Sequence, residues 1–364
     1  MKRRKFLSAG LGTALLPTVI NGFSLKAFAA ESPLAKLLGT ADNDHVLVIV
    51  QLNGGNDGLN MVIPIDQYSN YYNARTNVAI AENKILHLDS ITNTGLHPTM
   101  AGMQAMYNEG KLGIVQAVGY PQPNFSHFRA TDIWMTASNS NEVITSGWGG
   151  RFLDFEFPNF PIGYPNSDMT DPLGIQIGSV TSTVFQGPSV SMGMSITDPT
   201  SFYNLINGVE DPAPNTPAGN ELKYIRLVAM QTNLYADVVK DAALSVTQQS
   251  AYPNNNSLAD QLKIVARLIK GGLKTKIYMV SYTGFDTHSL QVDSNDTSIG
   301  RHATLLANVS GAIAAFQADL KYLDIEDRVM GLTFSEFGRR IKSNSSSGTD
   351  HGSAAPLFVF GKKA

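Results

Sequence analysis

Residues 46–52 read Val-Leu-Val-Ile-Val-Gln-Leu, and residues 53–58 continue as Asn-Gly-Gly-Asn-Asp-Gly. The first stretch is a short, continuous apolar run of the kind that a parallel sheet buries on both faces, and the glycines of the second stretch end it. A helical pattern at 98–108, with a proline in its first turn and a glycine after its end, leads into a second apolar run at 112–118. This order of strand, helix and strand predicts a βαβ unit.

The last third of the chain returns to the same alternation after a weakly patterned middle. Glycine and proline are frequent from about 120 to 219, which predicts an irregular insertion with short strands at 173–177 and 190–196. We expect the last strand of the chain to run antiparallel at the edge of the sheet. The sequence thus predicts an α/β fold with a mostly parallel central sheet and helices on both faces, formed by a single domain over residues 31–364. The further predicted helices are 221–250, 257–270 and 309–323, and the further strands are 276–282, 328–334 and 357–360.

The N-terminus has the features of an export signal. Residues 2–5 read Lys-Arg-Arg-Lys, residues 6–20 are mildly apolar, and Ala27-Phe28-Ala29 offers a small-residue cleavage site. A basic tail or a membrane anchor is the alternative, but the apolar stretch is too short and too rich in glycine, serine and threonine to span a bilayer. The arginine pair predicts a twin-arginine signal peptide over residues 1–30. We therefore expect the twin-arginine translocation machinery as a partner, a periplasmic or secreted location, and no membrane span in the mature chain.

The absence of cysteine limits the chemistry that this chain can perform. Disulfides, thiol nucleophiles and thiolate metal sites are all excluded, so any metal must be bound by carboxylate, imidazole, amide or hydroxyl groups. The whole chain has a formal charge of −3, but the predicted signal holds five basic residues and no acidic one, which leaves 22 basic and 30 acidic side chains in the remainder. This excess of negative charge disfavours nucleic acid and anionic lipid as partners.

Polar residues gather where the predicted strands end. Ligands of an open α/β sheet bind outside the carboxyl ends of its strands, so these residues are candidates for a functional site. Taken singly, each has a structural explanation as a turn former, a helix cap or a surface histidine. Two clusters pair an aspartate with a histidine, which suits a divalent cation bound by carboxylate and imidazole groups. The candidates are Asn53 and Asp57 after the strand at 46–52, Ser126 and His127 after the strand at 112–118, and Asp286 and His288 after the strand at 276–282. Glu336 and Arg339 follow the strand at 328–334, and Asp350 and His351 precede the strand at 357–360.

Seven motifs, in order along the chain, resemble those of one family. They are residues 51–60 (Gln-Leu-Asn-Gly-Gly-Asn-Asp-Gly-Leu-Asn), 96–98 (Leu-His-Pro), 126–128 (Ser-His-Phe), 147–151 (Gly-Trp-Gly-Gly-Arg), 284–288 (Gly-Phe-Asp-Thr-His), 335–339 (Ser-Glu-Phe-Gly-Arg) and 349–352 (Thr-Asp-His-Gly). The chain resembles a bacterial exported family catalogued as domain of unknown function 1501, which is grouped by resemblance with the alkaline phosphatase and sulfatase superfamily. The resemblance implies an α/β sandwich that cleaves phosphate or sulfate esters with paired metal ions, in a chain that lacks a last strand and helix.

The resemblance also implies a set of metal ligands, each close to the end or the start of a strand. They are Asn53 or, in its place, Asp57; Asp286 with His288; Glu336; and His351 with Asp350. Asn53 and the Ser335-Glu336 pair depart from the aspartate and the Asp-His pair that are usual in the superfamily. A one-metal site, or none, therefore stays open beside a two-metal site. The metal expected is a divalent ion: zinc, magnesium, calcium or manganese.

The catalytic residues that the resemblance and the surrounding sequence suggest lie around Ser126, which takes the place of the superfamily's nucleophile. A serine hydroxyl needs a cation or a base within hydrogen-bond reach to be activated. His127 beside it is a further ligand or proton carrier, and Arg129 or Arg339 is a candidate bidentate clamp for an ester oxyanion. Two functions follow. One is an exported metal-dependent hydrolase of phosphate or sulfate esters, acting on a small ester or a polysaccharide; the other is a non-catalytic member of the superfamily that binds exported proteins or polysaccharides.

Overall fold

The computed structural model describes residues 44–199, 214, 216, 219 and 233–364. The predicted signal peptide lies outside these residues. Of the helix predicted over 221–250, the described part is helical over 233–245. None of the helices in the described part of the chain is long and apolar enough to cross a membrane.

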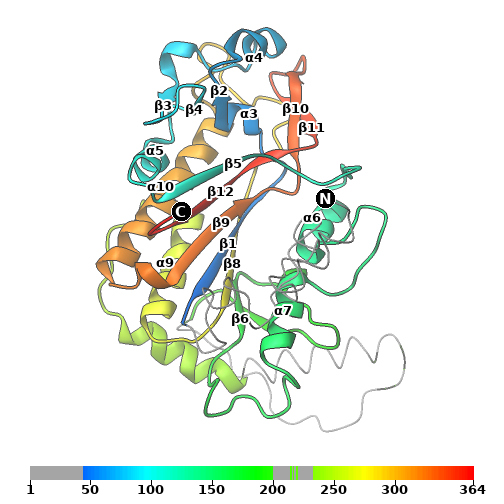
Figure 1. The fold of residues 1–364 in the computed structure, drawn as a ribbon, viewed down its shortest axis with the longest axis vertical. Coiled ribbons are helices and arrows are strands. Elements are labelled where there is room, and N and C mark those ends of the chain that lie inside the picture. Colours follow the sequence, from blue (N-terminus) through cyan, green and yellow to red (C-terminus); the bar gives the residue numbers. More distant parts are fainter. Residues whose placement is uncertain (1–43, 200–213, 215, 217–218, 220–232) are drawn as a thin grey trace, which may run out of the picture.

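A seven-stranded sheet forms the centre of the molecule (Figure 1). In spatial order its strands are β5 (Leu112–Val118), β12 (Ala355–Gly361), β9 (Val329–Phe334), β1 (Val46–Asn53), β8 (Ile277–Thr283), β6 (Gly174–Ile177) and β7 (Gly193–Ile196). β1 pairs in parallel with both β8 and β9, and β6 pairs in parallel with both β8 and β7. β12 is antiparallel to both of its neighbours, so six of the seven strands run in one direction. The predicted mostly parallel sheet is confirmed.

The place of the last strand differs from the prediction. β12 runs antiparallel, as expected, but it lies between β9 and β5 rather than at the edge. The edge position belongs to β5, which was expected to be buried on both faces and instead exposes nearly half of Val115. An apolar run indicates a strand, but periodicity carries no information on which strands will be neighbours, and this is why both positions were predicted wrongly.

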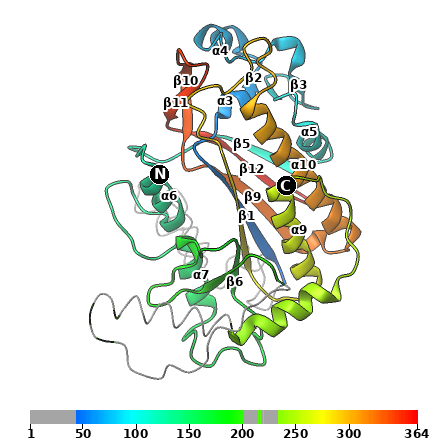
Figure 2. The ribbon, with the colours of Figure 1, turned by 180° about the vertical axis from the view of Figure 1, so that it is seen from behind.

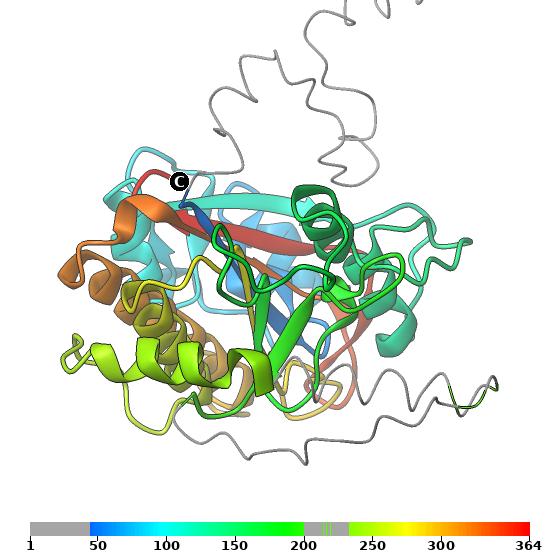
Figure 3. The same ribbon diagram turned by 90° about the horizontal axis from the view of Figure 1, so that it is seen from below.

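Helices cover both faces of the sheet, as predicted (Figures 1 and 2). Alternate residues of β1 point to opposite faces: Val48, Val50 and Leu52 pack into one hydrophobic cluster, and Ile49 packs into another. The first cluster includes side chains of α5 (Ala101–Asn108), α9 (Ser257–Lys270), α10 (Arg301–Tyr322) and the helix at 233–245. The second includes side chains of α6 (His127–Thr136) and α7 (Trp148–Glu156). Seen from below, the helices of the first cluster lie together on one side of the twisted sheet (Figure 3).

The segment predicted as an irregular insertion contributes regular structure in its described part. It contains α6, α7 and the short helix η5 (Thr183–Phe185), and its strands β6 and β7 extend the main sheet. A separate three-stranded sheet is formed by β2 (Val62–Pro64), β4 (Thr94–Leu96) and β3 (Leu86–His87), near α3 (Gly58–Met61), α4 (Tyr68–Ala74) and η4 (Glu82–Lys84). The short helix η6 (Glu326–Arg328) precedes β9.

A two-stranded hairpin completes the fold next to the central strands. β10 (Gly338–Ser343) and β11 (Thr349–Gly352) pair antiparallel, with Arg339 directly opposite His351. The hairpin begins four residues after the end of β9 and leads into β12. Three of the predicted site residues, Arg339, Asp350 and His351, therefore lie on this hairpin.

Candidate metal centre

The candidate site lies at the carboxyl ends of three adjacent strands, β1, β8 and β9. The last residues of β1 and β8, Asn53 and Thr283, are partners in register. The loops that follow them approach so closely that a Cβ atom on Gly54 would lie 2.4 Å from the backbone nitrogen of Asp286. Gly54 also has a φ of +126°, a conformation that glycine alone adopts readily. A glycine at this position is therefore what allows the two loops to meet.

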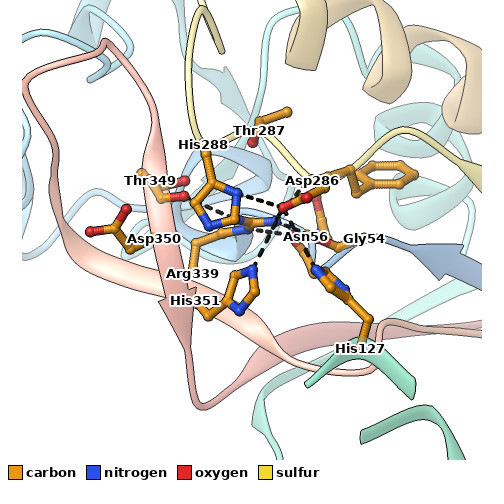
Figure 4. A network of polar contacts seen from close by, with 12 residues as sticks. Gly54, Asn56, His127, Asp286, Thr287, His288, Arg339, Thr349, Asp350 and His351 are labelled. Carbon is orange, nitrogen blue, oxygen red and sulfur yellow. Dashed lines mark hydrogen bonds and ion pairs between the residues drawn. The ribbon is translucent and has the colours of Figure 1, made fainter. Parts of the chain in front are cut away.

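The carboxylate of Asp286 is the centre of the cluster (Figure 4). Its Oδ1 atom lies 2.7 Å from Nδ1 of His288, 3.6 Å from Nε2 of His351 and 3.8 Å from Nε2 of His127. The guanidinium of Arg339 donates a hydrogen bond to the same oxygen at 2.6 Å. The side chain of Asp286 is 48% exposed, so solvent reaches the cluster. Groups from the loop after β8, from α6 and from the β10–β11 hairpin thus converge on one accessible carboxylate.

His127, the first residue of α6, is held by a buried carboxylate. Its Nδ1 lies 2.8 Å from Oε1 of Glu336, whose side chain is fully buried just after β9. The same oxygen accepts a hydrogen bond from the backbone N–H of Gly54 at 2.9 Å, so it acts as an acceptor and Nδ1 of His127 donates. The proton on Nδ1 leaves the lone pair of Nε2 free on the side that faces Asp286.

His351 on β11 is oriented in the same way by a backbone group. Its Nδ1 lies 2.9 Å from the carbonyl oxygen of Phe125, which can only accept a hydrogen bond. Burial and, after it, the charge of Arg339 hold the pKa of His351 below its ordinary value, which keeps the imidazole neutral. Its Nε2 atom is buried and has no hydrogen-bond partner among the described residues.

Arg339 holds the surrounding loops together. Its buried guanidinium donates to the backbone carbonyls of Gly55 at 2.6 Å, Thr349 at 2.8 Å and Phe285 at 3.2 Å, and it also bonds the carbonyl of Gly54. With the bond to Asp286, all three of its nitrogens are engaged. The structure therefore places this arginine as an organiser of the site, and its groups are not free to clamp a ligand.

The charge of Arg339 also sets the ionisation of Asp286. Burial on its own would raise the pKa of Asp286, but the hydrogen bond and charge of Arg339, followed by the charges of His288 and His127, outweigh it. The pKa of Asp286 is consequently below its ordinary value. The carboxylate is ionised at neutral pH, which is the form that binds metals.

One ligand atom each from His127, Asp286 and His351 lies within 4.8 Å of the other two, which makes these residues a group able to hold a metal ion. In both histidines the other ring nitrogen donates to a carboxylate or a carbonyl, as is usual for histidines that bind metals. The sequence predicts Asp286, His288 and His351 as metal ligands, with His127 as a further candidate. The structure brings His127 to Asp286 and His351, and His288 contacts both Asp286 and the ring of His351.

Two of the predicted ligands, Asn53 and Asp57, lie at the end of β1 and in the loop that follows it. The backbone carbonyl of Asn53 accepts a hydrogen bond from the N–H of Phe285 at 3.2 Å. Asp57 is fully buried, and both of its carboxylate oxygens lie 2.8 Å from Nη1 of Arg75. Burial would raise the pKa of Asp57, but Arg75 and further partners outweigh it and lower that pKa. Asp57 is thus half of a buried ion pair, and the structure does not bring it to the Asp286 cluster.

The remaining predicted residues surround the cluster at different positions. Asp350 is directed away from Asp286 in Figure 4, because it neighbours His351 on a strand and successive side chains point to opposite faces; it accepts a hydrogen bond from Asn344 at 3.1 Å. Arg129 donates to the carbonyls of the loop at 139–142. Ser126 is exposed at the start of α6, and its hydroxyl makes no capping hydrogen bond.

Sequence reasoning missed three contributors to this region. The carbonyl of Phe125 carries no side-chain signal, and only the fold brings it to His351. Arg75 lies in a stretch from which no prediction was made, although a buried aspartate requires a cationic or hydrogen-bonding partner. Gln291 lies in a stretch without periodicity, and nothing in the sequence indicates that it is fully buried.

Solved structures that are similar to this chain share little sequence with it. The C-terminal periplasmic domain of EcEptC from Escherichia coli, in complex with Zn, is 10% identical, with 88% of this chain and 74% of that chain covered and a TM-score of 0.39. The alkaline phosphatase from the Antarctic bacterium TAB5 is 9% identical, with 88% and 92% covered and a TM-score of 0.33. The PsFucS1 sulfatase from Pseudoalteromonas sp. is 10% identical, with 90% and 64% covered and a TM-score of 0.33. A comparison with curated proteins finds no match.

The match to a protein family covers most of the chain. The family model described as protein of unknown function (DUF1501) matches residues 44–362. This range begins before β1, ends after β12 and includes every residue of the Asp286 cluster. The resemblance that the seven motifs indicate is thereby confirmed, and the chain belongs to the DUF1501 family.

Proposed function

We propose that this protein is a metal-dependent hydrolase of phosphate or sulfate esters, with His127, Asp286 and His351 as ligands of one divalent ion. The environment of Nε2 of His351 is the observation that carries the proposal. This nitrogen is buried, has no hydrogen-bond partner among the described residues, and lies 3.6 Å from an oxygen of the ionised Asp286. A lone pair that faces a carboxylate is unfavourable unless a proton or a cation lies between them, and a shared divalent ion satisfies both.

The donor set fits a catalytic site of the zinc type. Such sites have three protein ligands, usually histidines and a carboxylate, and keep one position for water or substrate. Two imidazoles and the half-exposed carboxylate of Asp286 supply that number and leave the solvent side accessible. Nδ1 of His288, 2.7 Å from Asp286, is the nearest further imidazole group and orients the carboxylate.

When bound, a divalent ion supplies a Lewis acid that polarises an ester oxygen and lowers the pKa of a bound hydroxyl or water. The chain's own residues prepare the site: Glu336 and the carbonyl of Phe125 fix the two imidazoles, and Arg339 keeps Asp286 ionised. Ser126 is the proposed nucleophile. Its Oγ bonds to the phosphorus or sulfur atom as the bond to the leaving oxygen breaks, and the leaving oxygen takes the serine proton; water then releases the acid and restores the serine.

The experiment that tests this function measures metal content and ester turnover on the purified full chain. We expect about one ion of zinc, magnesium, manganese or calcium per chain, and cleavage of a chromogenic phosphate or sulfate ester that stops on chelation and resumes on metal addition. His351→Ala removes a ligand and should lower the bound metal at least tenfold at limiting metal. His87→Ala, which removes an exposed histidine of β3, is the matched control and should bind metal like the parent.

The outcomes separate the two parts of the proposal. Equal metal content in the His351→Ala and His87→Ala variants would contradict the ligand assignment. Stoichiometric metal without turnover of any phosphate or sulfate ester would contradict the hydrolase and favour the second function, a protein that binds exported partners or polysaccharides.

A further inference from the structure

A buried glutamine joins the two segments that carry Asp286 and His351. Gln291 is fully buried. Its side-chain oxygen accepts hydrogen bonds from the hydroxyls of Thr287 at 3.0 Å and Thr349 at 2.7 Å. Thr287 directly follows Asp286, and Thr349 lies two residues before His351 on the same face of β11. A single amide oxygen therefore binds the neighbours of two proposed ligands.

The nitrogen of the same amide connects these segments to a buried ion pair. It donates to Oδ2 of Asp57 at 2.6 Å, and Asp57 in turn pairs with Arg75. Arg75 also donates to the backbone carbonyls of Arg340 and Ile341, both on β10. The amide is thus attached to a buried ion pair that is itself hydrogen-bonded to the backbone of β10, the other strand of the hairpin.

The orientation of this amide is determined by its partners. The carboxylate of Asp57 only accepts, so the NH₂ group of Gln291 must face it and the oxygen must face the two threonines. The backbone N–H of Gln291 donates to Ser347 at 2.9 Å, and its carbonyl accepts from His302 at 3.0 Å. Every polar group of Gln291 is therefore engaged, and the residue has one well-defined position.

We infer that Gln291 is a positioning residue of the metal centre, which holds Asp286 and His351 at the separation that a shared ion requires. The inference rests on the proposed function. Metal sites tolerate displacements of only about 0.5 Å in their ligands, and the loop after β8 and the β10–β11 hairpin are separate segments that need a common support. The bond from the backbone N–H of Thr349 to the carbonyl of Thr287, 3.1 Å long, lies directly beside the amide of Gln291 and completes that support.

The first test measures the affinity of the full chain for Zn²⁺ by competition with a chromogenic chelator. Gln291→Met keeps the length of the side chain and removes both its acceptor and its donor, and we expect the Kd for zinc to rise about tenfold or more. Gln261→Met is the matched control. Gln261 on α9 likewise accepts and donates, at 3.1 and 2.9 Å, with the backbone of Ser281 in β8, and it also donates to the carbonyl of Ser257 at 3.1 Å. This variant should bind zinc with the affinity of the parent.

A second pair of variants tests the same connection from the hairpin. Thr349→Val removes the hydroxyl that donates to Gln291 with little change in size, and Thr349→Ser retains it. We expect weaker zinc binding in the valine variant and parental affinity in the serine variant. A residue that only stabilises the fold would lower the melting temperature of the metal-free protein and leave the zinc affinity of the folded protein unchanged, so Kd is measured well below that temperature.

The outcomes distinguish this inference from the function on which it rests. Parental Kd in both Gln291→Met and Thr349→Val would overturn the positioning role and leave the metal centre intact. A parent protein and a Gln261→Met variant that bind no zinc would overturn the metal centre itself, and the positioning role with it.

Discussion

His127 and His351 each use one ring nitrogen to direct the other. Glu336 accepts from the first and the carbonyl of Phe125 accepts from the second, and both leave a lone pair on the side of Asp286. The carboxylate of Glu336 is fully buried, so its removal from water costs free energy. The hydrogen bonds from the imidazole of His127 and the N–H of Gly54 offset that cost.

Ser126 gives a prediction at the same scale. Its hydroxyl is exposed and caps nothing, so Ser126→Ala should leave the unfolding free energy within about 0.5 kcal/mol of the parent. If Ser126 is the nucleophile, the variant should lose at least a hundredfold in kcat on the ester that the parent cleaves, with unchanged metal content. Ser167→Ala, at another exposed serine, is the control for both measurements. Parental turnover by the Ser126→Ala protein would remove this residue from the mechanism.

Single residues could be predicted from sequence only where a side chain carries the signal. The Asp286 and His351 motifs were identified because an aspartate and a histidine at a strand end are recognisable chemistry. The resemblance implies Glu336 as a metal ligand, and in the structure its carboxylate contacts His127 and the backbone of Gly54. The burial of Glu336 and its hydrogen bond from the backbone N–H of Gly54 cannot be predicted from the amino-acid sequence.

Among the elements, α10 is attached to the loop after β1 by a buried histidine. Nε2 of His302 lies 3.0 Å from Oδ1 of Asn56. Burial lowers the pKa of His302 to about 4; the carboxylate of Asp57 opposes this effect, and the charges of Arg75 and Arg339 add to it. The unfolded chain protonates the same imidazole near pH 6.5.

This difference predicts how stability depends on pH. Between about pH 6.5 and pH 4 the unfolded state binds the proton that the folded state excludes, so the free energy of unfolding falls as the pH falls through that window. The expected loss for His302 is about 2 kcal/mol from pH 7 to pH 5. Urea unfolding in the presence of a chelator measures it. His302→Gln should flatten the pH dependence by that amount and His87→Gln should not; equal slopes in the two variants would contradict the assignment.

The strands of the main sheet and the long helices α9 and α10 were predictable from sequence, whereas α6, α7, the three-stranded sheet and the β10–β11 hairpin were not, and neither was the order of the strands. Strands β1, β8, β9 and β12 coincide with clear apolar runs in the sequence, and α9 and α10 coincide with amphipathic helical patterns. The insertion of β12 between β9 and β5 depends on tertiary packing, because Phe358 and Phe360 of β12 join the same hydrophobic cluster as β1. No local pattern specifies that choice.

For the molecule as a whole, the sequence predicts export by the twin-arginine route. Replacing Arg3 and Arg4 together by Lys keeps the charge of the segment and removes the arginine pair, so we expect precursor to accumulate in the cytoplasm and the periplasmic amount to fall at least tenfold. Cell fractionation with immunoblotting measures both pools. Lys5→Arg leaves the pair intact and should be exported normally, and a normal periplasmic yield from the double lysine variant would refute the route.

The central position of β1 has a consequence for how the chain folds. Both of its neighbours come from far along the sequence, from residues 277–283 and 329–334. Contacts between such distant segments require the closure of long loops, and this slows folding. During synthesis the strand at 46–53 is made early and stays without its partners, with both of its hydrogen-bonding edges and its apolar side chains open to other chains. The yield of this protein in a cell therefore depends on how well that one strand is shielded until most of the chain has been translated.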